Sequence, residues 1–155
     1  MQLKNKFPFL AAAILCLSLT LSACAEETTG QLTPDVKRLE NAAPQRVLFV
    51  GNSYFYYNDS LHNHVERIGE EIGPHAAGDY AFKSATIGGA RLSHHPVGKL
   101  LQPGRLGVEQ PFELVILQGG SMEPLTSESR AAFREKAIEL SEKIRATGAA
   151  VALYM

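Results

Sequence analysis

The chain has 155 residues, of which 45% are hydrophobic and 20% are charged, and its net charge is -1. This composition is typical of a globular protein and excludes a disordered tail or a collagen-like fibre. A chain of this length has room for one small domain. Because 15 basic residues stand against 16 acidic ones, no excess of positive charge favours DNA or RNA, and we expect no nucleic-acid partner.

The first 23 residues have the pattern of a bacterial export signal. Two lysines, Lys4 and Lys6, precede an apolar run over residues 7–21, and small residues follow it. The run is shorter than the roughly 20 residues that a membrane-spanning helix requires, so a cleaved signal is favoured over a permanent transmembrane anchor. We therefore expect residues 1–23 to be removed on export.

The end of this run, LSAC at residues 21–24, resembles the bacterial lipobox, in which a signal peptidase cuts before the cysteine and the thiol carries diacylglycerol. The resemblance implies a lipid on Cys24 and anchoring to a membrane, and Ala25 in the next position implies the outer membrane. A plain secretory signal with an incidental cysteine is the alternative. Since Cys16 leaves with the signal, we expect neither a disulfide nor a cysteine-based metal site in the mature chain.

The chain after the signal divides into a tether and a domain. Residues 24–45 are mostly polar and contain two prolines, which predicts a tether to a domain over residues 46–155. Continuous apolar runs closed by glycine, at residues 47–50 and 114–117, predict strands that are buried on both faces. Weaker strands are expected over residues 80–87 and 149–154.

Helices are expected between these strands. Apolar residues at helical spacing predict helices with one apolar face over residues 61–72 and 133–144. A proline interrupts residues 91–101, for which we expect a short helix or a helical turn. The expected capping residues are Asp59 or Ser60 for the first helix and Thr126 or Ser127 for the long one.

The spacing of the strands predicts the topology. They begin near residues 46, 80, 113 and 149, so that each gap has the length of a β-α-β crossover. We therefore predict a three-layer α/β/α sandwich around a parallel, doubly wound sheet. Ligands bind such sheets at the carboxyl ends of the strands. The segments to search for function are thus residues 51–53, 88–89 and 118–121.

These three segments offer the groups that acyl transfer requires. Ser53 follows a buried strand, where its hydroxyl can act as a nucleophile and its N–H can face the same site. Gly88 or Gly89 can supply a second N–H for an oxyanion, and Gln118 a side-chain amide. Each feature also has a plain structural explanation, because Gly-Gly is usually a turn and a glutamine after a strand is often only solvated.

The sequence VLFVGNSY at residues 47–54 resembles the first block of the SGNH hydrolases, a superfamily of GDSL-like lipases and acylhydrolases, in a form with Gly-Asn-Ser. YYN at residues 56–58, GGARL at 88–92 and VILQ at 115–118 are similar to a bacterial subgroup of it. The resemblance covers residues 46–155. It implies a flavodoxin-like α/β/α fold, Ser53 as nucleophile, and an oxyanion hole from the N–H groups of Ser53 and Gly88 or Gly89 and a third-block side chain.

The chain departs from the superfamily pattern at two places. The third block is normally Gly-x-Asn-Asp, whereas this chain has Gly-Ser-Met-Glu at residues 120–123 or, in another register, Gln-Gly-Gly-Ser at residues 118–121. The usual asparagine is absent, and Gln118 is the only amide side chain near that position. The Asp-x-x-His block, which follows a fifth strand in the superfamily, has no counterpart. We therefore expect the C-terminal part of the domain to be missing from these 155 residues, which should then be nearly inactive and prone to aggregate.

The histidines present are weak candidates for the catalytic base. His62 and His64 lie two apart on a predicted helix and so point to different faces. The pair His94 and His95 lies in the loop after the second block and can approach the site, but it precedes a proline, a pattern that favours exposure to solvent. His75 is the fifth. Asp59 is better explained as a helix cap than as a catalytic acid.

Two functions from different classes compete. The first is a lipid-anchored serine hydrolase that removes an acyl group from an ester, with a carbohydrate ester as the expected substrate and no cofactor. The second is a non-catalytic surface lipoprotein that binds a glycan or small ligand at the same edge of the sheet. A nucleotide-binding domain is disfavoured, because no strand is followed by either glycine-rich phosphate-binding motif.

Overall fold

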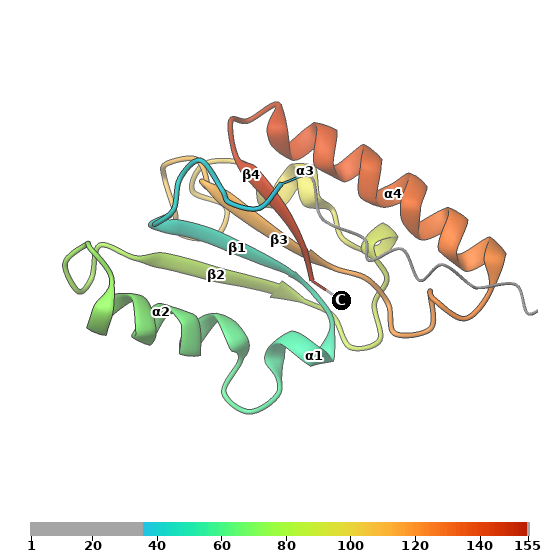
Figure 1. Ribbon diagram of the computed structural model, residues 1–155, viewed down its shortest axis with the longest axis horizontal. Helices are drawn as coiled ribbons and strands as arrows, with labels where there is room; N and C mark the ends of the chain where they lie inside the picture. The colour runs from blue at the N-terminus through green and yellow to red at the C-terminus, as the bar shows by residue number, and fades with distance from the viewer. Residues whose placement is uncertain (1–35, 155) are drawn as a thin grey trace, which may run out of the picture. The chain divides into compact units, whose positions relative to one another are not determined.

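Four strands form one parallel sheet at the centre of the computed structural model, which describes residues 36–154 (Figure 1). Their order is β2-β1-β3-β4. The chain therefore adds β2 on one side of β1 and then adds β3 and β4 on the other side, so that the order of strands reverses between β1 and β3. The predicted parallel, doubly wound, flavodoxin-like α/β fold is therefore confirmed. The strands are β1 (Arg46–Gly51), β2 (Ala81–Thr86), β3 (Leu114–Gln118) and β4 (Ala150–Tyr154).

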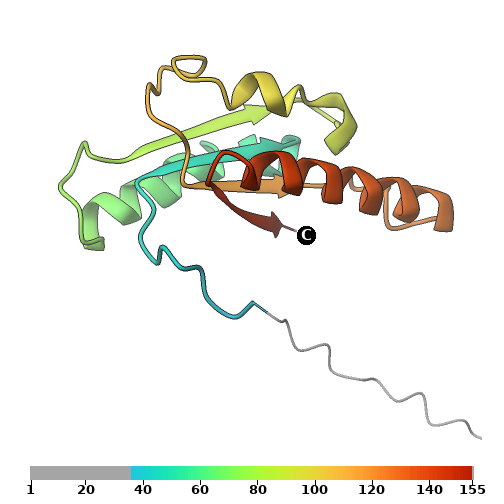
Figure 2. The same cartoon turned by 90° about the horizontal axis from the view of Figure 1, so that it is seen from above.

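Helices cover both faces of this sheet. One face carries α1 and α2, and the other carries η1, α3 and α4 (Figure 1). Figure 2 shows that α4 runs roughly along the strands. The helices are α1 (Ser53–Tyr56), α2 (Leu61–Ile72), the short 3-10 helix η1 (Leu92–His94), α3 (Val97–Leu100) and α4 (Ser127–Arg145).

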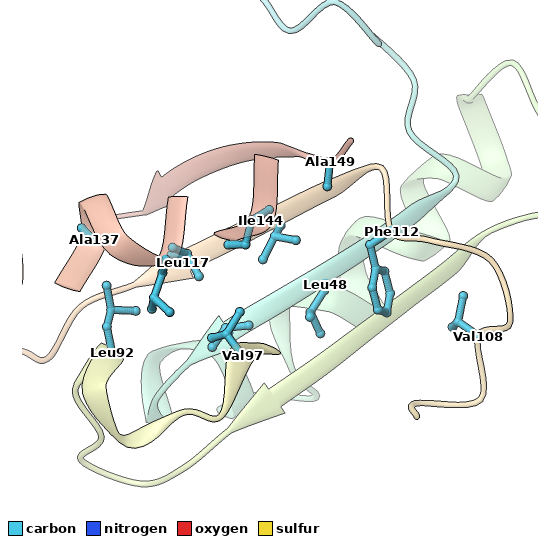
Figure 3. Close-up of a cluster of buried hydrophobic side chains, with 12 residues drawn as sticks. Leu48, Leu92, Val97, Val108, Phe112, Leu117, Ala137, Ile144 and Ala149 are labelled. Carbon is cyan, nitrogen blue, oxygen red and sulfur yellow. The ribbon is translucent and has the colours of Figure 1, made fainter. Parts of the chain in front are cut away.

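The two hydrophobic clusters follow from the alternation of side chains along each strand. In β1, Leu48 and Val50 face the larger cluster under α3 and α4, whereas Val47 and Phe49 face the cluster under α1 and α2. Figure 3 shows the larger cluster, to which α4 contributes Ile144. Because β1 and β3 are covered on both faces, their sequences are continuously apolar, as predicted.

The capping prediction is correct for α4. Thr126 is the N-cap residue, and its Oγ1 accepts the N–H of Ser129 at 3.1 Å. Ser129 Oγ in turn accepts the N–H of Thr126 at 3.2 Å. This reciprocal pair satisfies two backbone donors at the start of the helix.

The capping prediction for α2 is correct in position, but the side-chain hydrogen bond of a cap is missing. Ser60 occupies the N-cap position but makes no side-chain cap, because its backbone φ is 65° and its hydroxyl donates to the carbonyl of Phe55 at 3.1 Å. Asp59 instead forms an ion pair with Arg67 at 2.5 Å. The predicted apolar face is also only partly buried, since Ile72 is 80% exposed.

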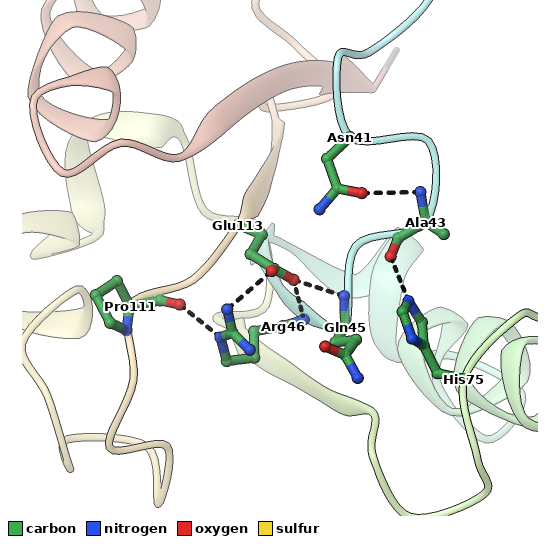
Figure 4. A network of polar contacts seen from close by, with 7 residues as sticks. All are labelled: Asn41, Ala43, Gln45, Arg46, His75, Pro111 and Glu113. Atoms are coloured by element: carbon green, nitrogen blue, oxygen red, sulfur yellow. Dashed lines mark hydrogen bonds and ion pairs between the residues drawn. The ribbon is translucent and has the colours of Figure 1, made fainter.

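A polar network joins the starts of β1 and β3 at the edge opposite the predicted site (Figure 4). Glu113 Oε2 accepts the backbone N–H groups of Gln45 at 2.6 Å and of Arg46 at 3.1 Å. The Arg46 side chain pairs with Glu113 Oε1 at 2.8 Å and donates through Nε to the Pro111 carbonyl. The network therefore fixes the starts of these two strands relative to each other, at the end of the sheet away from the site.

Part of the predicted tether contacts the domain. Leu39 packs against the cluster under α2, and His75 Nε2 lies 3.0 Å from the Ala43 carbonyl oxygen. The predicted signal, the predicted lipidation site Cys24 and the rest of the tether lie outside the described residues. Between residues 36 and 154, no helix has the length and apolar character needed to cross a membrane.

Candidate active site

The three segments predicted to carry function follow the carboxyl ends of β1, β2 and β3. In the parallel register, Gly51 at the end of β1 pairs with Thr86 at the end of β2, and Val50 pairs with Leu117 of β3. The strand ends therefore meet at one edge of the sheet, as the topology predicts.

Asn52 connects all three segments. Its side-chain Nδ2 donates to the carbonyl oxygens of Ala90, at 3.2 Å, and of Gly119, at 3.1 Å. Its Oδ1 accepts the N–H of Tyr54 at 3.1 Å. Asn52 is only 2% exposed, and every donor and acceptor of its side chain has a partner. It thus holds the loops after β2 and β3 against the start of α1.

Gln118 contacts the same turn from the end of β3. Its Oε1 accepts the backbone N–H of Asn52 at 2.9 Å, and the residue is 4% exposed. The structural alternative of a solvated glutamine is therefore wrong. Because the carbonyl oxygen of this amide is bonded, its orientation is set, and the NH₂ group is the donor that remains for another partner.

Gly51 permits this contact. A Cβ at this position would lie 2.5 Å from Gln118 Oε1 and 2.7 Å from a ring carbon of Phe55, closer than real carbon atoms approach. Only glycine therefore lets β1 pass between Gln118 and α1.

Ser53 is the first residue of α1 and is half-buried. Its backbone N–H belongs to the first turn of a helix, where N–H groups have no partner within the helix. Within residues 36–154, no acceptor bonds to this N–H, because the side chain of Asn52 caps Tyr54 instead. The Ser53 N–H is thus available to a ligand.

Gly88 and Gly89 form the centre of a tight turn after β2. The N–H of Ala90 donates to the carbonyl of Ile87 at 3.1 Å, and Gly89 has a φ of 67°, which an L side chain rarely adopts. Both glycines are exposed, and neither N–H is bonded within the described part of the chain. The turn explains the glycines structurally and leaves both predicted donors available.

Four of the five histidines make hydrogen bonds to groups other than Ser53. Those of His62, His64 and His75 contact Ser60 Oγ, the Asn58 carbonyl and the Ala43 carbonyl, and His94 Nδ1 accepts the Arg91 N–H. In the part of the chain described by the structure, no histidine is hydrogen-bonded to the Ser53 hydroxyl.

The expectation that both histidines before Pro96 are exposed is wrong for His95. This residue is 7% exposed, and its Nε2 is buried without a hydrogen-bond partner. Burial lowers the pKa of His95, an interaction with the Gly51 backbone opposes that shift, and His94 adds a smaller lowering effect. His95 is therefore buried near the Gly51 backbone at the end of β1 rather than exposed to solvent.

A pocket of about 580 Å³ opens beside Gln118. Ser53 does not line it, whereas its neighbour Tyr54 does. Glu123, which is 6% exposed, lies in its wall and accepts the Gly120 N–H through Oε2. Arg130, Phe133 and Tyr154 also line it.

Sequence reasoning placed Asn52 at this edge and aligned Glu123 with the third block, but it gave neither residue a role. It favoured exposure for His95, because the burial of Glu123 and His95 results from contacts between distant segments. Among residues 36–154 there is no group of three histidine, cysteine or acidic side chains that can hold a metal ion.

Comparison of the chain with family models, with curated proteins and with solved structures finds no match.

Proposed function

We propose that the protein is a serine ester hydrolase whose nucleophile is Ser53. The observation that carries this proposal is the hydrogen bond from the Asn52 N–H to Gln118 Oε1, at 2.9 Å. It leaves the Gln118 NH₂ group without a partner at the end of β3 and ties this side chain to the residue before Ser53, whose own N–H is free within the described residues. Preorganised donors of this kind stabilise the negative charge that develops when a hydroxyl attacks an ester.

The proposed reaction has two halves. Ser53 Oγ bonds to the ester carbonyl carbon while its proton passes to a base, and the carbonyl oxygen becomes an oxyanion. The donors are the Ser53 N–H, an N–H of Gly88 or Gly89, and Gln118 Nε2. Collapse of this intermediate releases the alcohol, which takes the proton from the base. Water then attacks the acyl-enzyme and releases the acid, which restores Ser53.

The test of this proposal is an assay of the full-length protein with a chromogenic acetate ester. Ser53→Ala should abolish turnover, whereas Ser93→Ala, at an exposed serine after the Gly-Gly turn, should not. Gln118→Ala should lower kcat by roughly 10²- to 10³-fold if its amide serves the oxyanion. Full activity of Ser53→Ala would contradict the assignment. Absence of turnover by the parent protein would favour the alternative, a lipoprotein that binds a glycan or small ligand without reaction.

We also propose that the enzyme is anchored to a bacterial membrane, more specifically the outer membrane, through a lipid on Cys24. The support is the lipobox-like sequence at residues 21–24. Intact-mass analysis of the membrane fraction should find acyl chains on a chain that begins at Cys24. Membrane association that persists in Cys24→Ser would contradict the anchor and leave the hydrolase proposal unaffected.

A further inference from the structure

A tyrosine hydroxyl lies against the Gly-Gly turn that follows β2. A Cβ added to Gly88 would lie 3.1 Å from the Tyr56 hydroxyl oxygen and, apart from its chain neighbours, would meet no other atom of residues 36–154 within 4 Å. Gly88, unlike Gly89, does not have a positive φ, and the space beside its Cα is taken by this hydroxyl. Tyr56 is 40% exposed, and its hydroxyl makes no hydrogen bond in the described part of the chain. It is thus a donor without a partner, beside a glycine whose N–H is also free.

The same helix carries this tyrosine and the proposed nucleophile. Ser53 is the first residue of α1 and Tyr56 is the last, and residues three apart on a helix lie on one face with Cβ atoms about 5 to 6 Å apart. The helix is anchored by Phe55, which is fully buried and whose carbonyl accepts the Ser60 hydroxyl at 3.1 Å. The Tyr57 ring packs edge-on against the Tyr56 ring, with centroids 5.2 Å apart. The Tyr56 ring is therefore held on the face of α1 that carries Ser53.

The distance between this hydroxyl and Gly88 allows one oxygen atom to accept from both groups. Two bonds of about 1.5 Å each join a Cβ to the backbone nitrogen, so the Tyr56 hydroxyl oxygen lies at most about 6 Å from the Gly88 nitrogen. Two donors up to about 6 Å apart can share an acceptor, because each hydrogen bond is about 3 Å long. An ester carbonyl oxygen that is bound by the Gly88 N–H can therefore accept from the Tyr56 hydroxyl as well.

We propose that Tyr56 is a further catalytic residue of this site, and that its hydroxyl donates a hydrogen bond to the oxyanion that forms when Ser53 attacks the ester. A phenol has one O–H to donate, and tyrosine is among the side chains that can serve an oxyanion in this way. The hydroxyl keeps its proton throughout, so no bond to Tyr56 forms or breaks. The assignment also favours Gly88 over Gly89 as the backbone donor, since no atom lies within 4 Å of a Cβ at Gly89. It rests on the proposed function and deepens it by adding a side-chain donor.

The kinetics of Tyr56→Phe in the full-length protein, with a chromogenic acetate ester, test this assignment. Phenylalanine keeps the ring that packs against Tyr57 and removes only the hydroxyl. We expect kcat to fall by roughly 10²-fold with KM unchanged, because the lost bond is made to charge that is present only in the transition state. The matched control is Tyr57→Phe, which should keep the parent kcat, because no atom of Tyr57 lies within 4 Å of the Cβ position at Gly88. The free energy of unfolding should be equal in the two variants.

Gly88→Ala supplies a second measurement. In the parent, the added Cβ presses on the Tyr56 hydroxyl, so we expect kcat to fall. In the Tyr56→Phe protein that oxygen is gone and no other described atom lies within 4 Å, so the same substitution should lower kcat less.

Four results would overturn the assignment: the parent kcat in Tyr56→Phe, a rise of KM alone in that variant, equal losses of kcat in Tyr56→Phe and Tyr57→Phe, or equal effects of Gly88→Ala in the two backgrounds. A failure of the proposed function has a different signature. In that case Ser53→Ala turns over the ester like the parent, or the parent does not turn it over at all, and the second of these results would overturn both proposals.

Discussion

Gln118 Oε1 accepts the backbone N–H of Asn52 at 2.9 Å, while the Asn52 side chain donates to the carbonyl oxygen of Gly119, the residue after Gln118, at 3.1 Å. Each residue therefore fixes the backbone next to the other. This reciprocal pair links the ends of β1 and β3, the two strands between which the direction of the sheet reverses. Parallel sheets of this topology bind ligands at that point.

Asn52→Asp should destabilise the protein although it changes one group only. The new carboxylate oxygen would replace a donor and face the carbonyl oxygens of Ala90 and Gly119 in a buried place. We expect a loss of about 2 to 4 kcal/mol in the free energy of unfolding at neutral pH. Denaturant unfolding measures it.

Asn41→Asp is the matched control, because the exposed Asn41 uses only its Oδ1, as acceptor for the Ala43 N–H. Aspartate keeps that acceptor, so this variant should unfold like the parent. Equal stability of the two variants would show that the Asn52 side chain is not the link between the loops.

Gly51→Ala should disturb both stability and the site. A Cβ would overlap Gln118 Oε1 and the ring of Phe55, so we expect a loss of about 1 to 3 kcal/mol and a displaced Gln118 amide. Gly98→Ala lies in α3, where the nearest side-chain atom is 3.4 Å from the added Cβ, and should be neutral or stabilising by up to about 1 kcal/mol. Thermal unfolding of the two variants distinguishes a local clash from a general effect of alanine.

His95 should make the protein less stable in mild acid. Burial lowers the pKa of His95 in the folded state below its ordinary value of 6.5, so the unfolded chain takes up the proton more readily. The contribution to stability is complete above pH 6.5 and is lost as pH falls below it. Burial lowers the pKa of His62 as well, so that residue contributes in the same direction.

Denaturant unfolding at a series of pH values measures this contribution. His95→Gln should reduce the slope of unfolding free energy against pH below 6.5, and the His62 part should persist. His94→Gln, at the exposed neighbour, should change the slope less, because His94 is the smallest of the named causes of the His95 shift. An unchanged slope in His95→Gln would show that burial of His95 does not lower its pKa in the folded state.

The sheet could be predicted from the sequence because each central strand is covered on both faces and is continuously apolar as a result. The bounds of α2 could be predicted as well, but the backbone before it could not, since Asn58, Asp59 and Ser60 all have positive φ and Asp59 pairs with Arg67, eight positions away. A local capping pattern cannot report such a competing partner.

For the candidate site as well, the positions of residues along the strands could be predicted, whereas their distant partners could not. The nucleophile and oxyanion candidates lie directly after strands, so the parallel topology predicted that they share one edge. The partners of Asn52 lie 38 and 67 positions away in the chain, and no spacing rule identifies them. The burial of Glu123 and His95 likewise depends on how loops pack over the finished sheet.

The central claim, that Ser53 is an activated nucleophile, is tested most directly by locating a covalent adduct. The protein as its gene encodes it is treated with a fluorophosphonate, and peptide mass spectrometry identifies the modified residue. The account predicts an adduct on Ser53 that is absent from Ser53→Ala and forms more slowly in Gln118→Ala. An adduct on another serine, or no adduct in a protein that hydrolyses esters, would contradict it.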